Sequence, residues 1–175
     1  IDRSDRPPIR LAFAFDQGSA ALRSRESMFG FTSVVKLDVM LDDVLKLKTL
    51  QSLNLNGLSV TNEQLNRLQA LTQLEELWLD GAAITNEGVK LLKSWPQLNS
   101  LNLARTSITD AAAATLAELK QLETLDLSHT QVTDESILHL KTLEQLKSLD
   151  VSETGITEEG ATELKAALPE CKIEH

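Results

Sequence analysis

The sequence predicts an α/β solenoid, in which short strand–helix units stack into one elongated array with a parallel β-sheet along one side. The first observation is an internal repeat, because the sequence aligns with itself in steps of 24 residues over 120 residues without a gap. The second is that apolar residues occupy the same columns in every step. Within each step, apolar residues are first two positions apart, as are Leu53 and Leu55, and later three positions apart, as are Leu65 and Leu68. This change is expected when a strand is followed by a helix. Units this small bury their apolar faces only by stacking on one another.

The strand of each unit is predicted from the motif LxxLxL. Its last two leucines are two positions apart, so both point to one face of a strand and the residue between them points to the other face. The apolar columns begin in the first unit at Leu50, Leu53, Leu55, Val60 and Leu68 and recur at intervals of 24 residues. This register predicts a continuous leucine core with a row of variable residues on the opposite face of the sheet.

The helix of each unit is predicted to begin at a threonine that follows a valine or isoleucine. Threonine is a favoured N-cap, because its hydroxyl accepts a hydrogen bond from the first turn of a helix. Thr61 together with Gln64 completes a capping box. The predicted N-caps are Thr61, Thr85, Thr109, Thr133 and Thr157. Columns such as Leu65 and Leu68 then face the core at i, i+3 spacing.

These motifs resemble the leucine-rich repeat, LxxLxLxx[NT]x[IV], over at least residues 31–173. The variant is similar to a 24-residue bacterial, planctomycete-like type, LxxTxITDxGLxxL. The resemblance implies a right-handed solenoid with a concave parallel β-sheet and short convex helices. Many such repeats carry a bridging asparagine at the positions that hold Leu58, Ala82, Thr106, Thr130 and Thr154 here. We expect packing to close the first two coils and a ladder of threonine hydroxyls to close the last three.

The N-terminal part differs in composition from the repeats. All four phenylalanines lie within the first 31 residues. Residues 1–30 carry a net charge of +1, whereas residues 31–175 carry −10. The alternation from Ile9 to Phe15 predicts a strand, and Ser19–Met28 is expected to form a short helix. Phe13, Phe15 and Phe31 are expected to pack against the end of the leucine core.

We therefore divide the chain into four parts. Residues 1–30 are expected to form an N-terminal cap, because solenoids need their exposed ends covered. Residues 31–46 are expected to form a truncated repeat with its strand around Leu37–Val39 and most of its helix missing. Residues 47–167 hold five full repeats. Residues 168–175 are expected to form a C-terminal cap turn, in which Cys171 is a buried residue rather than a reactive thiol.

Composition excludes several classes of function. The formal net charge of −9 disfavours non-specific binding to nucleic acid or to an anionic membrane, since both need a basic face. A single cysteine excludes an internal disulfide framework and a multi-cysteine zinc site. No apolar run approaches the ~20 residues of a membrane-spanning helix. The absence of cysteine-rich caps favours a bacterial source, and we expect a monomer.

The search for catalytic chemistry gives two weak patterns. Asp126, Ser128 and His129 hold the residue types of a hydrolytic triad, but they lie on one short segment without a glycine-rich turn for an oxyanion hole. His129 with Asp126, Asp150 and Glu153 would be a poor zinc site, and three carboxylates are few ligands for a calcium site. We interpret these residues as ordinary polar side chains of the sheet surface. The sequence therefore predicts no enzyme, no metal and no cofactor.

Trp78 is the strongest candidate for a binding residue. It occupies the variable position between two core leucines, so it should stand on the open face of the sheet, between Asn54 and Asn102 on the adjacent strands. The same column is expected to begin at Asp38 in the truncated repeat. Trp95 instead occupies a leucine column and is expected in the core. The predicted partner-binding residues are Glu76, Trp78, Asp80, Asn102, Arg105 and Asp126.

Two functions fit these features. The first is a non-catalytic module that binds a protein or peptide on its concave face, with a basic partner favoured by the acidic charge. The alternative is a structural scaffold or adaptor segment of a larger bacterial protein whose activity lies in another domain. The substrate arm of a ubiquitin-ligase adaptor is disfavoured, because no F-box-like segment is present and threonine stands where those repeats usually carry cysteine.

Overall fold

The computed structural model describes residues 9–16, 19–24, 27–29 and 37–175, with side chains at positions 10, 11 and 37–175. Seven parallel strands and two antiparallel ones form one sheet in the order β3-β2-β1-β4-β5-β6-β7-β8-β9. The parallel strands are β1 (Ile9–Asp16), β4 (Leu50–Asn54), β5 (Glu76–Trp78), β6 (Ser100–Asn102), β7 (Thr124–Asp126), β8 (Ser148–Asp150) and β9 (Lys172–Glu174). The antiparallel strands are β2 (Ser19–Ser24) and β3 (Ser27–Phe29).

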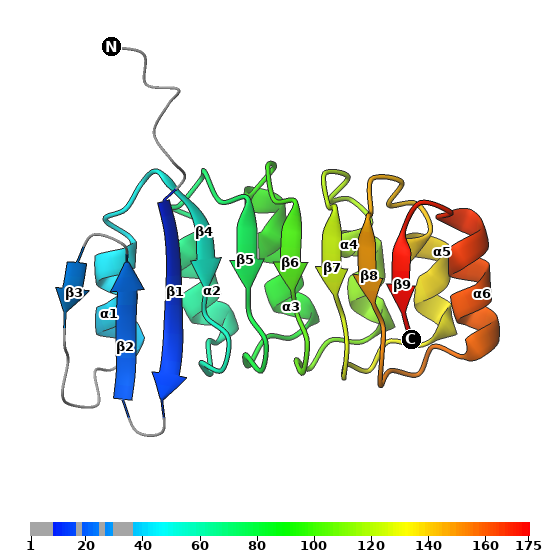
Figure 1. Cartoon of the computed structure of the whole chain (residues 1–175), viewed down its shortest axis with the longest axis horizontal. Helices are drawn as coiled ribbons and strands as arrows, with labels where there is room; N and C mark the ends of the chain where they lie inside the picture. The colour runs from blue at the N-terminus through cyan, green and yellow to red at the C-terminus, as the bar shows by residue number, and fades with distance from the viewer. Residues whose placement is uncertain (1–8, 17–18, 25–26, 30–36) are drawn as a thin grey trace, which may run out of the picture.

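Helices cover one face of this sheet and leave the opposite face open (Figure 1). The α-helices are α1 (Leu37–Val44), α2 (Asn62–Leu68), α3 (Asn86–Val89), α4 (Ala113–Leu116), α5 (Ile137–Leu140) and α6 (Glu158–Ala167). The 3-10 helices are η2 (Lys90–Ser94), η3 (Asp110–Ala112) and η4 (Asp134–Ser136). None of the helices in the described segments is both long and apolar enough to cross a bilayer.

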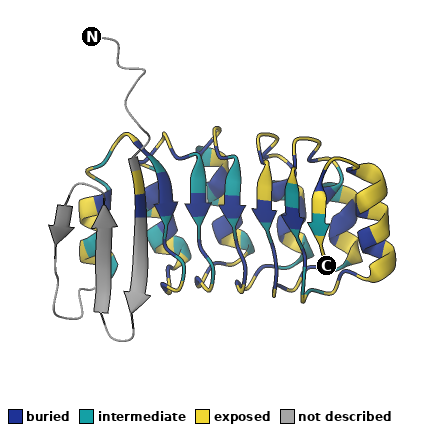
Figure 2. Ribbon diagram, in the orientation of Figure 1, coloured by how far each residue is buried: buried dark blue, intermediate teal, exposed yellow. Residues whose placement is uncertain are grey.

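The leucine columns form the core, as the spacing predicts. Leu53, Leu77 and Leu101 align in register on adjacent strands, and the same register continues through Leu125 and Leu149. These five side chains are at most 1% exposed. Exposed residues gather instead on the turns and on the outer surface of α6 (Figure 2). A buried residue between two partly exposed ones is therefore the pattern of β5, β6 and β8.

The predicted strand around Leu37–Val39 is wrong, because this segment belongs to helix α1. Leu37, Leu41 and Val44 are spaced i, i+4, i+7, which puts them on one helical face. Leu41 and Val44 are buried in the leucine core. The spacing of apolar residues here satisfied both a strand and a helix, and packing against α2 selects the helix.

The polar face of α1 is held by α2. Arg67 on α2 pairs with Asp38 at 3.0 Å and also with Asp42, and Gln64 donates to Asp38 at 3.0 Å. Asp38 therefore lies among the helices and not on the open face, which corrects its predicted place in the column of Trp78. The column is instead continued by β1.

β1 extends the parallel sheet by pairing with β4. The predicted strand from Ile9 to Phe15 is confirmed as β1, and its Leu11 is 2% exposed beside Leu53. The helix expected at Ser19–Met28 is wrong, because β2 and β3 occupy this segment. Antiparallel pairing with β2 satisfies the backbone groups on the free edge of β1. The packing predicted for Phe13, Phe15 and Phe31 lies outside the described side chains.

Four of the five predicted N-cap hydroxyls accept a hydrogen bond from their helix. Thr61 also forms the predicted capping box with Gln64. Thr85 stands at the N-cap position of α3, but its side chain makes no capping hydrogen bond. The capping hydroxyls belong to Thr61, Thr109, Thr133 and Thr157.

The predicted ladder of hydroxyls between coils is wrong. Thr106, Thr130 and Thr154 each donate 2.6 Å hydrogen bonds to the carbonyl three residues earlier, within their own coil. Their hydroxyls therefore close the turn after the strand locally. A single short side chain that satisfies this carbonyl has no second donor with which to bridge to the next coil.

The coils are instead joined where the helices begin, by what we call the Asx–Thr ladder. In its first rung Asn62 Nδ2 donates to Thr85 Oγ1 at 2.8 Å, while Asn62 Oδ1 accepts from the Thr85 amide at 3.2 Å. In the last two rungs an aspartate accepts both hydrogen bonds. The further rungs are Asn86–Thr109, Asp110–Thr133 and Asp134–Thr157. Each rung satisfies a backbone amide that the helix itself leaves free.

Two glycines make room for this ladder. A Cβ atom on Gly88 would lie 2.2 Å from Asn62 Oδ1, and one on Gly160 would lie 2.2 Å from Asp134 Oδ1. Both glycines stand three residues after an N-cap threonine. Two of the coils with a larger residue at this position begin their helices with the 3-10 turns η3 and η4. The residue at this position therefore helps to set the shape of the first helical turn.

The C-terminal segment does more than form the predicted closing turn. Leu168 and Cys171 are buried at the end of the core, and β9 then pairs in parallel with β8. This segment adds the last strand of the sheet. α6 carries exposed charged residues such as Glu158 and Glu159, which suits the end of a stack that faces water.

The thiol of Cys171 should react slowly in the folded protein. Burial raises the pKa of the Cys171 thiol above its ordinary value, and the thiolate is the reactive form. We expect an aromatic disulfide reagent at pH 8 to label the native chain at least tenfold more slowly than the chain unfolded in urea. Equal rates would show that the C-terminal segment does not cover the thiol.

Candidate functional site

The open face of the sheet presents the side chains between and after the core leucines. In each coil these are the variable residue between the two strand leucines, the residues two positions before and two positions after it, and the next residue, which lies in the turn. In the coil of β5 they are Glu76, Trp78, Asp80 and Gly81. Equivalent residues of successive coils form rows across the sheet, and within a row they are about 4.8 Å apart, which is the distance between neighbouring strands. A residue on one coil therefore contacts its equivalents 24 positions away.

Trp78 occupies the predicted place on this face. The register pairs it with Asn54 on β4 and with Asn102 on β6. Its side chain is half-buried, in contrast to Trp95, which is 0% exposed. The Trp95 indole donates to the Leu71 carbonyl at 3.0 Å, so its predicted role in the core is confirmed. The chain thus has one tryptophan in the core and one on the open face.

The other residues in the row of Trp78 serve the turns that end the strands. Asn54 Oδ1 accepts a hydrogen bond from the amide two residues later at 3.0 Å. Asn102 accepts the equivalent bond at 2.8 Å, and Asp126 and Asp150 each accept one at 2.9 Å. An asparagine or aspartate side chain at this position therefore closes the turn by a local hydrogen bond to the backbone.

Trp78 breaks this pattern, because an indole has no acceptor for the amide of Asp80. That amide donates instead to Asn56 Oδ1, on the preceding coil, at 2.9 Å. The turn after β5 is therefore closed by a neighbour. The Asn56 side chain thus replaces the hydrogen bond that Trp78 cannot make, and Trp78 does not stabilise its own turn.

Two acidic residues flank Trp78 along its strand, and each is paired with an arginine. Arg10 on β1 reaches Glu76 Oε1 at 3.2 Å, and Arg105 pairs with Asp80 Oδ2. The second oxygens, Glu76 Oε2 and Asp80 Oδ1, are buried and have no hydrogen-bond partner among the described residues. Among the described residues, each carboxylate is thus paired through one oxygen only.

The six residues predicted from sequence lie together. Asn102 Nδ2 donates to Asp126 Oδ2 at 2.8 Å, which continues the patch onto β7. The sequence reasoning missed Arg10 and Asn56. The alternation in residues 9–15 already placed Arg10 opposite the core side of its strand, and the missing information was that β1 pairs with β4 and so belongs to the open face.

The turn residues form a further row with left-handed backbone conformation. Gly57 and Gly81 have φ of 74° and 72° in the first two coils, a conformation that glycine adopts without steric penalty. The next three coils carry Arg105, His129 and Glu153 there, with φ of 54–56°. All three side chains are exposed. The last three coils thus carry a side chain at a backbone position where glycine would be less strained.

The weak catalytic pattern does not assemble into a triad. The Ser128 hydroxyl donates to Asp126 Oδ1 at 2.7 Å and is part of the turn, while His129 projects from the left-handed position as an exposed residue. Among the described residues no group of three or more histidine, cysteine, aspartate or glutamate side chains is placed to hold a metal ion.

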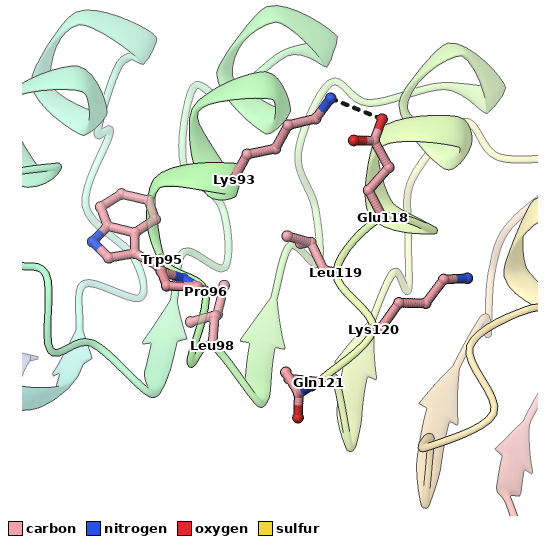
Figure 3. A pocket seen from close by; sticks show the side chains of 8 residues that line it. All are labelled: Lys93, Trp95, Pro96, Leu98, Glu118, Leu119, Lys120 and Gln121. Atoms are coloured by element: carbon pink, nitrogen blue, oxygen red, sulfur yellow. Dashed lines mark hydrogen bonds and ion pairs between the residues drawn. The ribbon is translucent and has the colours of Figure 1, made fainter.

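A shallow groove of about 290 Å³ lies away from the open face, at the turns that lead from helix to strand (Figure 3). Its apolar wall includes Pro96 and Leu119, and its polar rim includes Lys93, which pairs with Glu118 at 2.8 Å. Trp95 borders the groove, but its indole is bonded inside the core. The groove brings together no nucleophile with a base.

Comparison with known proteins identifies the family. Residues 72–132 match a family model described as leucine rich repeat, and residues 145–165 match a second model with the same description. The chain is a leucine-rich repeat protein, and its parallel sheet with helices on one face is the solenoid of that family. The sequence has no significant match among curated proteins.

Solved structures from two bacteria share the fold. An internalin from Listeria monocytogenes superposes with a TM-score of 0.63 at 26% identity, over 75% of this chain and 36% of that one. Internalin C2 from the same organism gives 0.55 at 24% identity, over 75% and 54%. A leucine-rich repeat protein from Leptospira interrogans gives 0.53 at 22% identity, over 76% and 39%. This chain therefore spans between about a third and about half of the length of these proteins.

Proposed function

We propose that this protein is a non-catalytic interaction module that binds a protein or peptide on the open face of its sheet, around Trp78. The leucine-rich repeat family and the internalin-like neighbours support a protein-interaction module in general. The finer proposal concerns the place of binding. It assigns the contact to the patch of Glu76, Trp78, Asp80, Asn102, Arg105 and Asp126.

The observation that carries the proposal is the substitution of tryptophan into a row of turn-closing side chains. Asparagine or aspartate at this position stabilises its own turn, whereas the turn after Trp78 is closed by a hydrogen bond to Asn56 of the preceding coil. The indole donates no hydrogen bond to another described residue and remains half-buried. A large aromatic side chain on a rigid strand is a typical anchor of an interface, because it buries a large area at little entropic cost.

The acidic charge of the chain favours a basic partner. Attraction between opposite charges raises the rate of association and is screened by salt. We therefore expect binding to weaken as ionic strength rises. The protein itself is proposed to act as a monomer that presents this one face.

The second candidate function, a scaffold or adaptor segment, differs in what it requires of Trp78. A spacer needs the stacked coils and their ends, but it does not need an aromatic residue on the open face. The effect of removing the indole therefore separates the two candidates.

Selection of peptides from a displayed random library against the full chain tests the proposal. We expect selected peptides to bind Trp78→Ala at least 100-fold more weakly than the parent, because the anchor is lost. The melting temperature should change by no more than ~1 °C, since the side chain lies outside the core. Leu138→Ala is the matched control, because Leu138 is 65% exposed on the helix side. Peptides that bind the parent and Trp78→Ala equally well would contradict the proposal.

A further inference from the structure

The two carboxylates beside Trp78 indicate which chemical group the partner presents. We propose that a lysine or arginine side chain of the partner lies over the Trp78 indole, between Glu76 and Asp80, and neutralises both carboxylates. This inference rests on the proposed function, since it names the chemistry of the ligand at the same site. It is independent of which protein carries the basic residue.

The unpaired oxygens are the first line of support. Glu76 Oε2 and Asp80 Oδ1 are each buried without a hydrogen-bond donor in the described structure. A buried anionic oxygen that lacks a donor is unfavourable, because it has lost water without gaining a partner. The two residues stand at i−2 and i+2 from Trp78, on the same face of β5. The two residues lie about 13 Å apart along the strand with Trp78 midway between them, so a cation over the indole is attracted by both carboxylates.

The indole supplies the second line of support. The face of tryptophan attracts cations more strongly than that of the other aromatic residues. A cation over Trp78 would gain this attraction together with that of the two flanking carboxylates. The same position is unfavourable for an acidic side chain, which would meet both carboxylates at close range.

Arg10 and Arg105 do not already satisfy this requirement. Their side chains are 64% and 59% exposed, so each lies at the rim of the patch and pairs with a single carboxylate oxygen. Exposed ion pairs of this kind are weak and rearrange readily. Each ion pair engages one oxygen of its carboxylate, and the second oxygen has no donor in the described structure.

The open face as a whole has the matching charge. Within the described part of the chain it carries six carboxylates, Glu76 and Asp80 included, against three arginine or lysine side chains. All three basic residues are paired with a carboxylate, and no described lysine or arginine pairs with Asp126, Asp150 or Glu153. A basic segment that continues from Trp78 toward β8 would therefore meet further unneutralised acids.

The double variant Glu76→Gln with Asp80→Asn tests this inference on the full chain. We expect library peptides that depend on Trp78 to carry a lysine or arginine, and to bind the double variant at least tenfold more weakly. Replacing that basic residue with norleucine or citrulline in the synthetic peptide should give a similar loss. The control, Glu158→Gln with Glu159→Gln, removes the same charge from exposed positions on α6 and should change binding by less than twofold.

The outcomes separate this inference from the proposed function. Peptides that need Trp78 but contain no basic residue, or that bind the double variant as well as the parent, would overturn the inference and leave the binding site in place. Failure to select any Trp78-dependent peptide would overturn both. Melting curves of each variant identify any loss of binding that comes from unfolding.

Discussion

Replacing Leu125 with alanine should lower the free energy of unfolding by about 2–5 kcal/mol, the range for leucine deletions in tight cores. Leu125 is 1% exposed and lies on β7, between Leu101 and Leu149 on the adjacent strands. The truncated side chain would leave a cavity that two neighbouring coils share. Urea denaturation followed by circular dichroism measures the change.

The exposed leucine on the helix side provides the control. Leu138→Ala should shift the free energy of unfolding by no more than ~0.5 kcal/mol, as for most surface substitutions. In a stack where each coil contacts only its neighbours, loss at β7 can also uncouple the two halves. A decrease in the denaturant slope would reveal this uncoupling. Equal destabilisation by the two variants would contradict the register of the core.

Removing the carboxylate of Asp110 should lower the free energy of unfolding by about 2 kcal/mol, because hydrogen bonds to charged groups contribute about 1.5–3 kcal/mol. Its two oxygens accept from the Thr133 amide at 2.7 Å and from the Thr133 hydroxyl at 2.8 Å. Asp110→Ala would leave both donors without this partner and would also remove a negative charge from the first turn of η3. Thermal and urea unfolding of the variant measure the loss.

The chain supplies its own control for Asp110. Asn62 and Asn86 occupy the equivalent position in the first two coils and bind the next threonine through one acceptor and one donor. Asp110→Asn should therefore keep the rung and lose less than ~1 kcal/mol. If the asparagine and alanine variants lose the same stability, the Asx–Thr ladder does not join the coils.

The repeat frame was predictable because the period of the leucines sets strand, face and lateral neighbour together. Knowing that Leu53, Leu77 and Leu101 align is enough to place Trp78 between Asn54 and Asn102. The Asx–Thr ladder was not predictable in the same way. Each threonine was recognised as an N-cap, but its partner stands 23 residues earlier and contacts it only after stacking.

The N-terminal predictions failed where the pattern was short. Leu37 and Val39 alternate like a strand, but Leu41 and Val44 complete a helical stripe with Leu37, and contact with α2 decides between the two. The segment from Ser19 forms a strand because it pairs antiparallel with the preceding strand β1, and this pairing outweighs the local helix propensity of the segment. Strand pairing also explains why Arg10 was missed. Its position on the open face follows only from the pairing of β1 with β4.

The two indole N–H signals in a ¹H–¹⁵N spectrum give the most direct test of the binding site. The chain has two tryptophans, so the buried Trp95 signal, bonded to Leu71, serves as an internal reference for Trp78. On titration with a selected peptide we expect the Trp78 indole signal to shift or broaden while that of Trp95 stays in place. An unchanged Trp78 signal, with shifts confined to amides of the helices on the other face, would contradict binding at the open face.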